Sequence, residues 1–241
     1  MSNFIRHEPC PKCLSKDNLG VYDDGHTYCF GCGYRTFPEV NSKSRLFRLE
    51  VQHGARKPIE FKISDHIPLK AVKWLKSYGI TDEEITRYSI GYDASIESLV
   101  FPYFNPLGEI SYASTRYFGD DKRQPKSRTH GKKPIGYITT IGKVDSDTLV
   151  FVEDPISAIK VGRSYAASPL LGSHVPVEAL ELATRLYKHV GVWLDPDMCL
   201  RASKAVLRGR MLTGKDVFVV KSELDPKYYS EDQIRGYVAE A

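Results

Sequence analysis

The last hundred residues alternate between short apolar runs and stretches with helical periodicity. The apolar runs are "TLVFVE" (148–153), "SPLLG" (168–172), "GVWLD" (191–195) and "DVFVV" (216–220). The helical stretches are "ISAIKVGRS" (156–164), "VEALELATRLYKHV" (177–190), with Leu182, Leu186 and Val190 at four-residue steps, and the basic "LRASKAVLRGRML" (200–212). Strands that alternate with helices predict a parallel sheet wrapped by helices, an α/β fold. Ligands of such sheets bind beyond the carboxyl ends of the strands.

The middle of the chain has a different pattern. A helical period runs over 71–78 and stops at Gly79. Thr81, followed three residues later by Glu84, is typical of a capping box that opens a second short helix. Residues 99–117 alternate apolar and polar positions around a central Asn-Pro-Leu-Gly. This segment therefore predicts a helical hairpin followed by a β-hairpin.

The length of 241 residues exceeds one typical domain, and 41% hydrophobic residues suffice for a sizeable core. Residues 38–58 lack a sustained period and carry scattered Lys and Arg, which predicts a linker. We expect a small N-terminal module, this linker, and one or two core-bearing units.

Four of the five cysteines lie close together near the N-terminus. Cys10/Cys13 and Cys29/Cys32 are each split by two residues, with fifteen residues between the pairs, a spacing that predicts a four-thiolate zinc ribbon. The alternative is two disulfides, which need an oxidising compartment. No signal-peptide h-region and no apolar run of membrane-spanning length precede or follow them, so we expect a cytosolic chain with reduced thiols. A zinc site with no ligand-facing role also fits the cysteines.

The formal net charge of +4 is small, but its distribution is uneven. One short stretch contains Lys122, Arg123, Lys126, Arg128, Lys132 and Lys133. A cluster of this kind attracts polyanions, and a solvated surface loop is an equally good interpretation.

Acidic residues follow three of the predicted strands. They are Glu153, the pair Asp195 and Asp197, and Asp225. Because carboxyl ends of parallel strands meet at one edge, these side chains can converge there. Hard oxygen ligands favour magnesium or manganese, and a cation would relieve the repulsion between like charges. For Asp154, which precedes a proline, a turn or helix cap is the better interpretation.

These acidic positions, together with "DPKYY" (225–229), resemble a Toprim domain, the metal-binding fold of bacterial-type primases, topoisomerases and some nucleases. With the cysteine-rich segment, the chain resembles the primase portion of short-tailed coliphage primase-helicases and, more distantly, bacterial replicative primases. Further matches are "DGHTYCFGC" (24–32), "LKSYGITDEEITRYSIGY" (75–92) and "GEISYASTRYF" (108–118). The resemblance implies a zinc ribbon (1–40), a linker (41–60), a basic α+β subdomain of an RNA polymerase domain (61–145) and a Toprim subdomain (146–241).

The resemblance also implies an activity, DNA-templated synthesis of short RNA primers from ribonucleoside triphosphates on single-stranded DNA. Asp195 and Asp197, helped by Asp225, would hold Mg²⁺ or Mn²⁺, and Glu153 would be the general base. Residues expected to contact nucleic acid or nucleotide are His26 and Tyr28 of the ribbon, with Arg116, Lys122, Arg123, Lys126 and Arg128, while Tyr112 and Tyr117 would stack on bases. For His26, a turn beside the zinc is an equal alternative. The chain departs from the family pattern where Ser157 replaces an expected aspartate.

Two other classes of function remain open, a Toprim-type nuclease and a non-catalytic zinc-ribbon adaptor for single-stranded nucleic acid. The sequence has no G-x-x-x-x-G-K-[ST] loop, so we expect a separately encoded replicative helicase as partner. Ile234 and Val238 predict an amphipathic C-terminal helix that would dock this helicase or pack on the chain's own sheet. No membrane association is expected, and the location would be the cytoplasm of a phage-infected bacterium.

Overall fold

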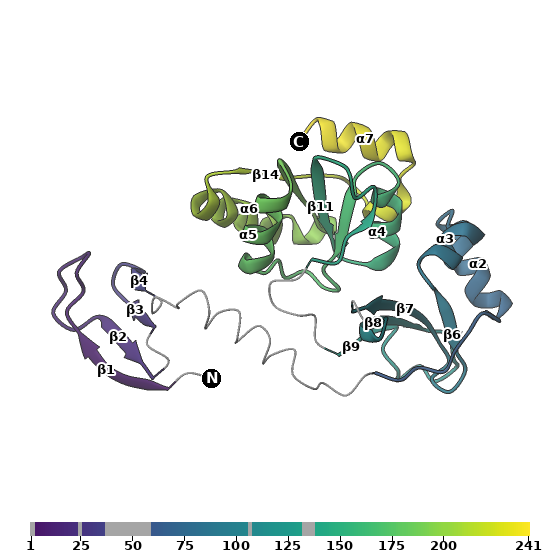
Figure 1. Ribbon diagram of the computed structural model, residues 1–241, viewed down its shortest axis with the longest axis horizontal. Helices are drawn as coiled ribbons and strands as arrows, with labels where there is room; N and C mark the ends of the chain where they lie inside the picture. Colours follow the sequence, from purple (N-terminus) through teal and green to yellow (C-terminus); the bar gives the residue numbers. More distant parts are fainter. Residues whose placement is uncertain (1–2, 24–25, 37–58, 106–107, 132–137) are drawn as a thin grey trace. The chain divides into compact units, whose positions relative to one another are not determined.

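The computed structural model describes residues 3–23, 26–36, 59–105, 108–131 and 138–241. The chain separates into two compact units, Met1–Arg56 and Lys57–Ala241 (Figure 1). Of the predicted linker (41–60), only the last two residues are among those described.

The first unit is a small antiparallel sheet. Its strands, in spatial order, are β1 (Phe4–Glu8), β2 (Leu19–Tyr22), β3 (Thr27–Cys29) and β4 (Arg35–Thr36). Among the described residues, its buried apolar cluster consists of Cys10, Leu19 and Cys29, with the partly buried Tyr34 packed against them. So small a core cannot supply much folding free energy, and small domains of this kind usually gain the missing part from metal binding.

The second unit begins with two helices and an antiparallel sheet. The elements are β5 (Ile63–Ser64), α2 (Leu69–Ser77), α3 (Asp82–Arg87), β6 (Gly91–Asp93), β7 (Ser98–Phe104), β8 (Ile110–Tyr117) and β9 (Ser127–His130), with the strands in sequence order across the sheet. The predicted capping box is confirmed, because Thr81 Oγ1 accepts from Glu84 N while Glu84 Oε2 accepts from Thr81 N. The helix stop at Gly79, whose φ is +71°, and the β7–β8 hairpin are confirmed as well.

A mostly parallel sheet follows. Its elements are β10 (Ile141–Gly142), β11 (Thr148–Val152), α4 (Pro155–Gly162), β12 (Ala166–Pro169), α5 (Val177–Leu186), β13 (His189–Trp193), the 3-10 turn η1 (Pro196–Met198), α6 (Cys199–Thr213), β14 (Asp216–Val219), the 3-10 turn η2 (Pro226–Tyr228) and α7 (Glu231–Ala239). The strand order is β10-β12-β11-β13-β14, and only β10 runs antiparallel. β12 and β13, the two strands that follow β11 in the sequence, lie on opposite sides of it. The boundary between β11 and β13 is therefore a topological switch point.

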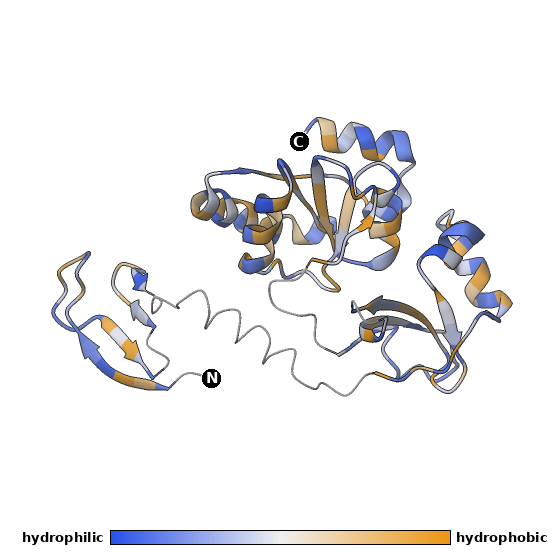
Figure 2. Ribbon diagram, viewed as in Figure 1, coloured by the Kyte–Doolittle hydropathy of each residue, from blue (hydrophilic) through white to orange (hydrophobic). Residues whose placement is uncertain are grey.

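The parallel sheet is covered on both faces. Along β11, Val150 and Val152 pack into one cluster with α4 and α7, and Leu149 and Phe151 pack into another with α5 and α6. In Figure 2 the strands of this sheet are coloured mainly as hydrophobic, whereas the helices around it carry both hydrophobic and hydrophilic residues. Such two-sided burial explains why the strands read as continuous apolar runs.

One prediction about a helical face is wrong. The four-residue steps from Leu182 to Val190 do not form the buried face of α5, because Leu186 is 64% exposed and Val190 belongs to β13. Ala179, Leu180 and Ala183 are buried instead. Of the two alternatives for the C-terminal helix α7, packing on the chain's own sheet is confirmed, since Ile234 and Val238 lie in the core. Within the described residues, no helix is both long and apolar enough to span a bilayer.

Candidate functional site

The four N-terminal cysteines converge at one point. Their Sγ atoms all lie within 4.8 Å of one another, with 3.7 Å between Cys10 and Cys32 and between Cys13 and Cys29. A tetrahedral zinc with bonds of about 2.3 Å has sulfur–sulfur edges of about 3.8 Å. All four are free thiols, which does not support the disulfide alternative. Hydrogen bonds with the side chain and backbone of Ser15 lower the pKa of Cys13 to about 6, which favours the thiolate that binds metal. The cluster fits a structural zinc ion with no open coordination position.

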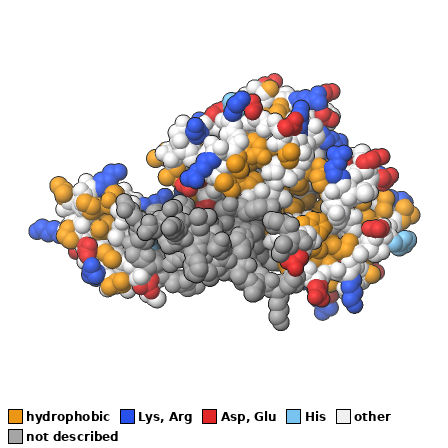
Figure 3. Space-filling view, in the orientation of Figure 1, with side chains coloured by type: hydrophobic (Ala, Val, Ile, Leu, Met, Phe, Trp, Pro, Cys, Tyr) orange, Lys and Arg blue, Asp and Glu red, His pale blue; other side chains and the backbone are white. Residues whose placement is uncertain are grey.

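The ribbon sheet also exposes large apolar side chains. Tyr28 is partly exposed and lies edge-on to the exposed Phe30, with ring centroids 5.2 Å apart. Phe4 is also exposed, and His26 stacks on Tyr22 with a centroid distance of 4.1 Å. Hydrophobic surface on this unit is visible in Figure 3. The sequence analysis named His26 and Tyr28 but missed the exposed Phe4 and Phe30. Both could have been found, because the N-terminal unit has more aromatic residues than so small a core can bury.

Two predicted catalytic carboxylates meet at the switch point of the parallel sheet. Glu153 directly follows β11 and Asp195 follows the neighbouring β13 by two residues. Glu153 Oε1 accepts a hydrogen bond of 3.2 Å from the backbone N–H of Asp195. The strand pairing of β11 with β13 thus fixes both residues at one edge.

The charge of this edge is only partly balanced. Burial, followed by the negative charges of Glu153 and Asp225, raises the pKa of Asp195 to about 7. Burial also raises the pKa of Glu153, with a further contribution from nearby carboxylates. Asp195 Oδ1 is buried and has no hydrogen-bond partner among the described residues. An unpartnered buried carboxylate oxygen fits a cation ligand.

The other half of the edge is neutralised by a lysine. Lys227 Nζ, on η2, lies 2.5 Å from Asp225 Oδ2 and 3.2 Å from Asp154 Oδ2. Asp154 caps α4 as predicted, because its Oδ1 accepts from the backbone N–H groups of Ile156 and Ser157. The sequence analysis missed Lys227, although this lysine lies only two residues after Asp225 in the "DPKYY" segment that the analysis quoted.

Asp197 lies on the exposed η1 turn. Among the described residues, only the four cysteines bring three or more potential ligand atoms within 4.8 Å of one another. The acidic edge is therefore an open arrangement. It fits magnesium, which takes one or two carboxylates and completes its shell with water and substrate phosphates.

The predicted basic stretch is partly paired. Arg123 forms two hydrogen bonds with Asp121, at 2.9 and 3.1 Å, and Arg128 bonds Gln124 at 2.8 Å. Lys122 and Lys126 form no ion pair within the part of the chain that is described. The guanidinium of Arg116 lies 5.1 Å from the centroid of the Trp74 ring. Lys132 and Lys133 lie outside the described residues.

Tyr112 is not available for base stacking. It is 1% exposed, stacks on Tyr103 at 4.6 Å and hydrogen-bonds Thr139. That prediction is wrong because Tyr112 belongs to the buried core of the second unit, and the four residues Tyr112 to Thr115 of β8 are all buried. Tyr117 is partly exposed, and its hydroxyl donates to Glu97 at 3.2 Å.

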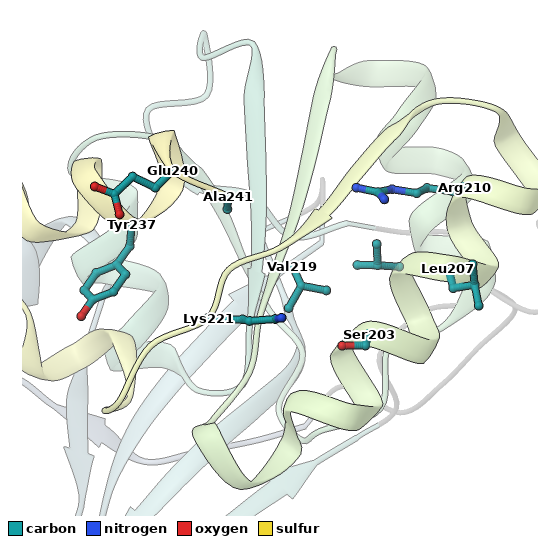
Figure 4. A pocket seen from close by; sticks show the side chains of 9 residues that line it. Ser203, Leu207, Arg210, Val219, Lys221, Tyr237, Glu240 and Ala241 are labelled. Atoms are coloured by element: carbon teal, nitrogen blue, oxygen red, sulfur yellow. The ribbon is translucent and has the colours of Figure 1, made fainter.

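The second unit also contains a cavity of about 510 Å³. It is formed by α6, the end of β14 and α7, and includes Arg210, Lys221 and Tyr237 (Figure 4). None of its lining residues belongs to the acidic edge.

Comparisons with known proteins agree on one architecture. No family model matches the chain. A DNA helicase/primase of Enterobacteria phage T3 is 34% identical over 62 residues, which are 26% of this chain and 11% of that protein. The chain therefore spans a small part of the length of this relative.

Solved structures match over more of the chain. The zinc-binding and RNA polymerase domains of the Aquifex aeolicus primase superpose with a TM-score of 0.59 at 16% identity, covering 99% of this chain and 80% of that one. A DnaG primase catalytic domain bound to single-stranded DNA gives 0.57 at 16% identity, covering 83% of this chain and 79% of that one. The chain has the fold of the zinc-binding and RNA polymerase domains of primases.

Proposed function

We propose that this chain is a DNA primase, a DNA-directed RNA polymerase that makes short RNA primers on single-stranded DNA. The observation that carries the proposal is the pairing of Glu153 and Asp195 at the switch point of a primase-like fold. An adaptor without chemistry has no use for two carboxylates whose pKa values are raised at the place where parallel sheets bind ligands.

The acidic edge would carry out nucleotidyl transfer. Asp195 and Asp197 would hold a magnesium or manganese ion, which supplies positive charge to triphosphate oxygens when bound. Glu153 would accept the proton of the attacking 3′-hydroxyl, and its raised pKa brings it closer to the working range of a general base. Asp225 would act through the charge balance of the site, because Lys227 is its direct partner.

Substrates would be held by cations and aromatic rings. Arg116, Lys122, Arg123, Lys126 and Arg128 are proposed to contact phosphates of template or triphosphate. In the zinc ribbon, Tyr28 and His26, together with Phe4 and Phe30, would supply ring surfaces for template bases. The domain ranges 1–40, 41–60, 61–145 and 146–241 belong to this proposal.

The test is an incubation of the chain with single-stranded DNA, magnesium and labelled ribonucleoside triphosphates. A primase yields short RNA that depends on template and on all required nucleotides. DNA degradation without triphosphates would instead support the nuclease alternative, and DNA binding without either product would support the adaptor. The same reaction with Asp195→Asn is the matched control.

We further propose a separately encoded replicative helicase as partner and the cytoplasm of the infected bacterium as the location. Addition of a helicase should raise primer yield. Equal yields with and without helicase would count against the partner.

A further inference from the structure

Lys227 is a cation held inside an acidic site. Its side chain is 15% exposed, and its ammonium contacts one carboxylate from the end of β11 and another from the segment after β14. Two carboxylates within 3.2 Å of Nζ favour the charged form of the ammonium.

The oxygens of Asp154 are already used. Oδ1 accepts two backbone N–H groups at the start of α4, and Oδ2 accepts from Ser157 Oγ at 2.8 Å and from Lys227 Nζ. A divalent ion could reach Oδ2 of Asp154 or Oδ2 of Asp225 only by displacing the ammonium. Removal of one partner from a mostly buried ion pair leaves an uncompensated charge, which is strongly unfavourable.

The other half of the edge lacks such a partner. Asp195 Oδ1 is buried without a hydrogen bond among the described residues, and Glu153 receives one backbone N–H. The edge is thus divided between carboxylates that share a protein cation and carboxylates that do not.

We propose that Lys227 takes the place of a second divalent cation, so that this edge binds a single ion, at Asp195 and Asp197 beside Glu153. Lys227 is a positioning residue in this arrangement, since it holds Asp154 and Asp225. The inference deepens the proposed function and rests on it only for the expectation that the site takes magnesium or manganese.

The test is the number of Mn²⁺ ions bound by the zinc-saturated chain, measured by electron paramagnetic resonance titration without DNA or nucleotide. We expect one ion for the wild type, two for Lys227→Gln and one for Lys227→Arg, which keeps the charge. The double variant Lys227→Gln with Asp225→Asn should return to one, because it also removes the freed carboxylate. Lys221→Gln, an exposed lysine of the same segment, should leave the number at one.

Asp195→Asn should remove the ion bound by the wild type, which assigns it to this edge. Two ions on the wild type, or one on a folded Lys227→Gln variant, would overturn the inference. If Lys227→Gln fails to fold, as judged by circular dichroism, the counts for the wild type and for Asp195→Asn still decide. A changed count in a chain that makes no RNA would support the inference and contradict only the proposed primase activity.

Discussion

At the scale of single residues, Asp195 offers the most direct test of the proposed role of the acidic edge. Its unpartnered Oδ1 is the best ligand atom at the edge, so Asp195→Asn should lower primer synthesis by about a hundredfold or more. Single-strand binding should change little, because the basic residues of the antiparallel sheet are untouched. Gel-based primer assays and fluorescence anisotropy measure the two effects. Asp197→Asn should behave in the same way, and full activity in both variants would contradict the assignment.

Asp195 should also make the metal-free chain sensitive to pH. Its pKa of about 7 in the folded state exceeds the unfolded value of about 3.9, so the folded state binds more protons between these values. The carboxyl therefore lowers stability as pH rises from about 4 to 7. After allowance for solvent screening, Asp195→Asn should be more stable than the wild type by about 1 kcal/mol at pH 8 and equal to it near pH 4. Urea denaturation at both pH values, with a chelator that spares the zinc, checks the difference.

Within the acidic edge, the sequence marked some residues and left others unmarked. Glu153 and Asp195 were predictable because each follows an apolar run that could only be a buried strand. Lys227 was not, since a 3-10 turn has no hydrophobic period that fixes where its side chains lie. Tyr112 was misread because a tyrosine in an alternating strand fits both the solvent face and the core.

At the scale of elements, α4 joins the parallel sheet to the helical hairpin. Arg163 bonds both carboxylate oxygens of Glu84 at 2.8 Å and the carbonyl of Gly79 at 2.8 Å, and Lys160 bonds the carbonyl of Tyr78 at 3.2 Å. These bonds fasten the ends of α2 and α3 to a helix more than seventy residues away in the sequence.

Loss of Arg163 should therefore destabilise the second unit. Arg163→Ala leaves Glu84 nearly buried without its partner, and we expect a loss of about 3 kcal/mol at pH 7. Burial raises the pKa of Glu84, but the bonds from Arg163 and Thr81 outweigh it and lower the pKa overall. The stability from Glu84 is therefore present above about pH 4.3 and lost as pH falls through the lower folded value. Thermal unfolding should show a smaller difference at pH 3, whereas the exposed Arg185→Ala should stay within about 0.5 kcal/mol of the wild type.

The basic stretch around β9 should act unequally along its length. If each lysine contacts one phosphate, Lys122→Gln with Lys126→Gln should reduce the salt-dependence slope of single-strand binding by about 1.4, or about 0.7 per contact. Arg123→Gln should change the slope less, because Asp121 already pairs that guanidinium. Binding measured over a series of salt concentrations gives the slope, and an unchanged value would make the stretch a solvated loop.

The two helical hairpin elements and all four main strands of the parallel sheet were predictable, because capping and continuous burial leave clear patterns. The buried face of α5 was not. The small residues Ala179 and Ala183 of α5 pack on the sheet. The prediction instead followed the spacing of the larger leucines, of which Leu186 is exposed.

At the scale of the whole molecule, the ribbon and the second unit should lose structure independently. The ribbon has its own sheet and its own cluster of Cys10, Leu19 and Cys29. Cys29→Ser should unfold the ribbon and abolish template-dependent initiation, while Mn²⁺ binding and dinucleotide extension persist. Limited proteolysis should leave a stable fragment close to Lys57–Ala241. Equal loss of extension would contradict the separation of roles.

The anchoring of α7 has a practical meaning for experiments on the chain's end. Ile234 and Val238 anchor a helix that begins four residues after Lys227, and Arg235 of that helix donates to Ser164, two residues after the end of α4. Tyr237 of this helix also lies 4.7 Å, centroid to centroid, from Tyr229, which directly follows the η2 turn that carries Lys227. We therefore expect a tag, fusion or truncation at α7 to disturb the packing around Lys227, so that a loss of the proposed primer synthesis would imitate the loss of a partner.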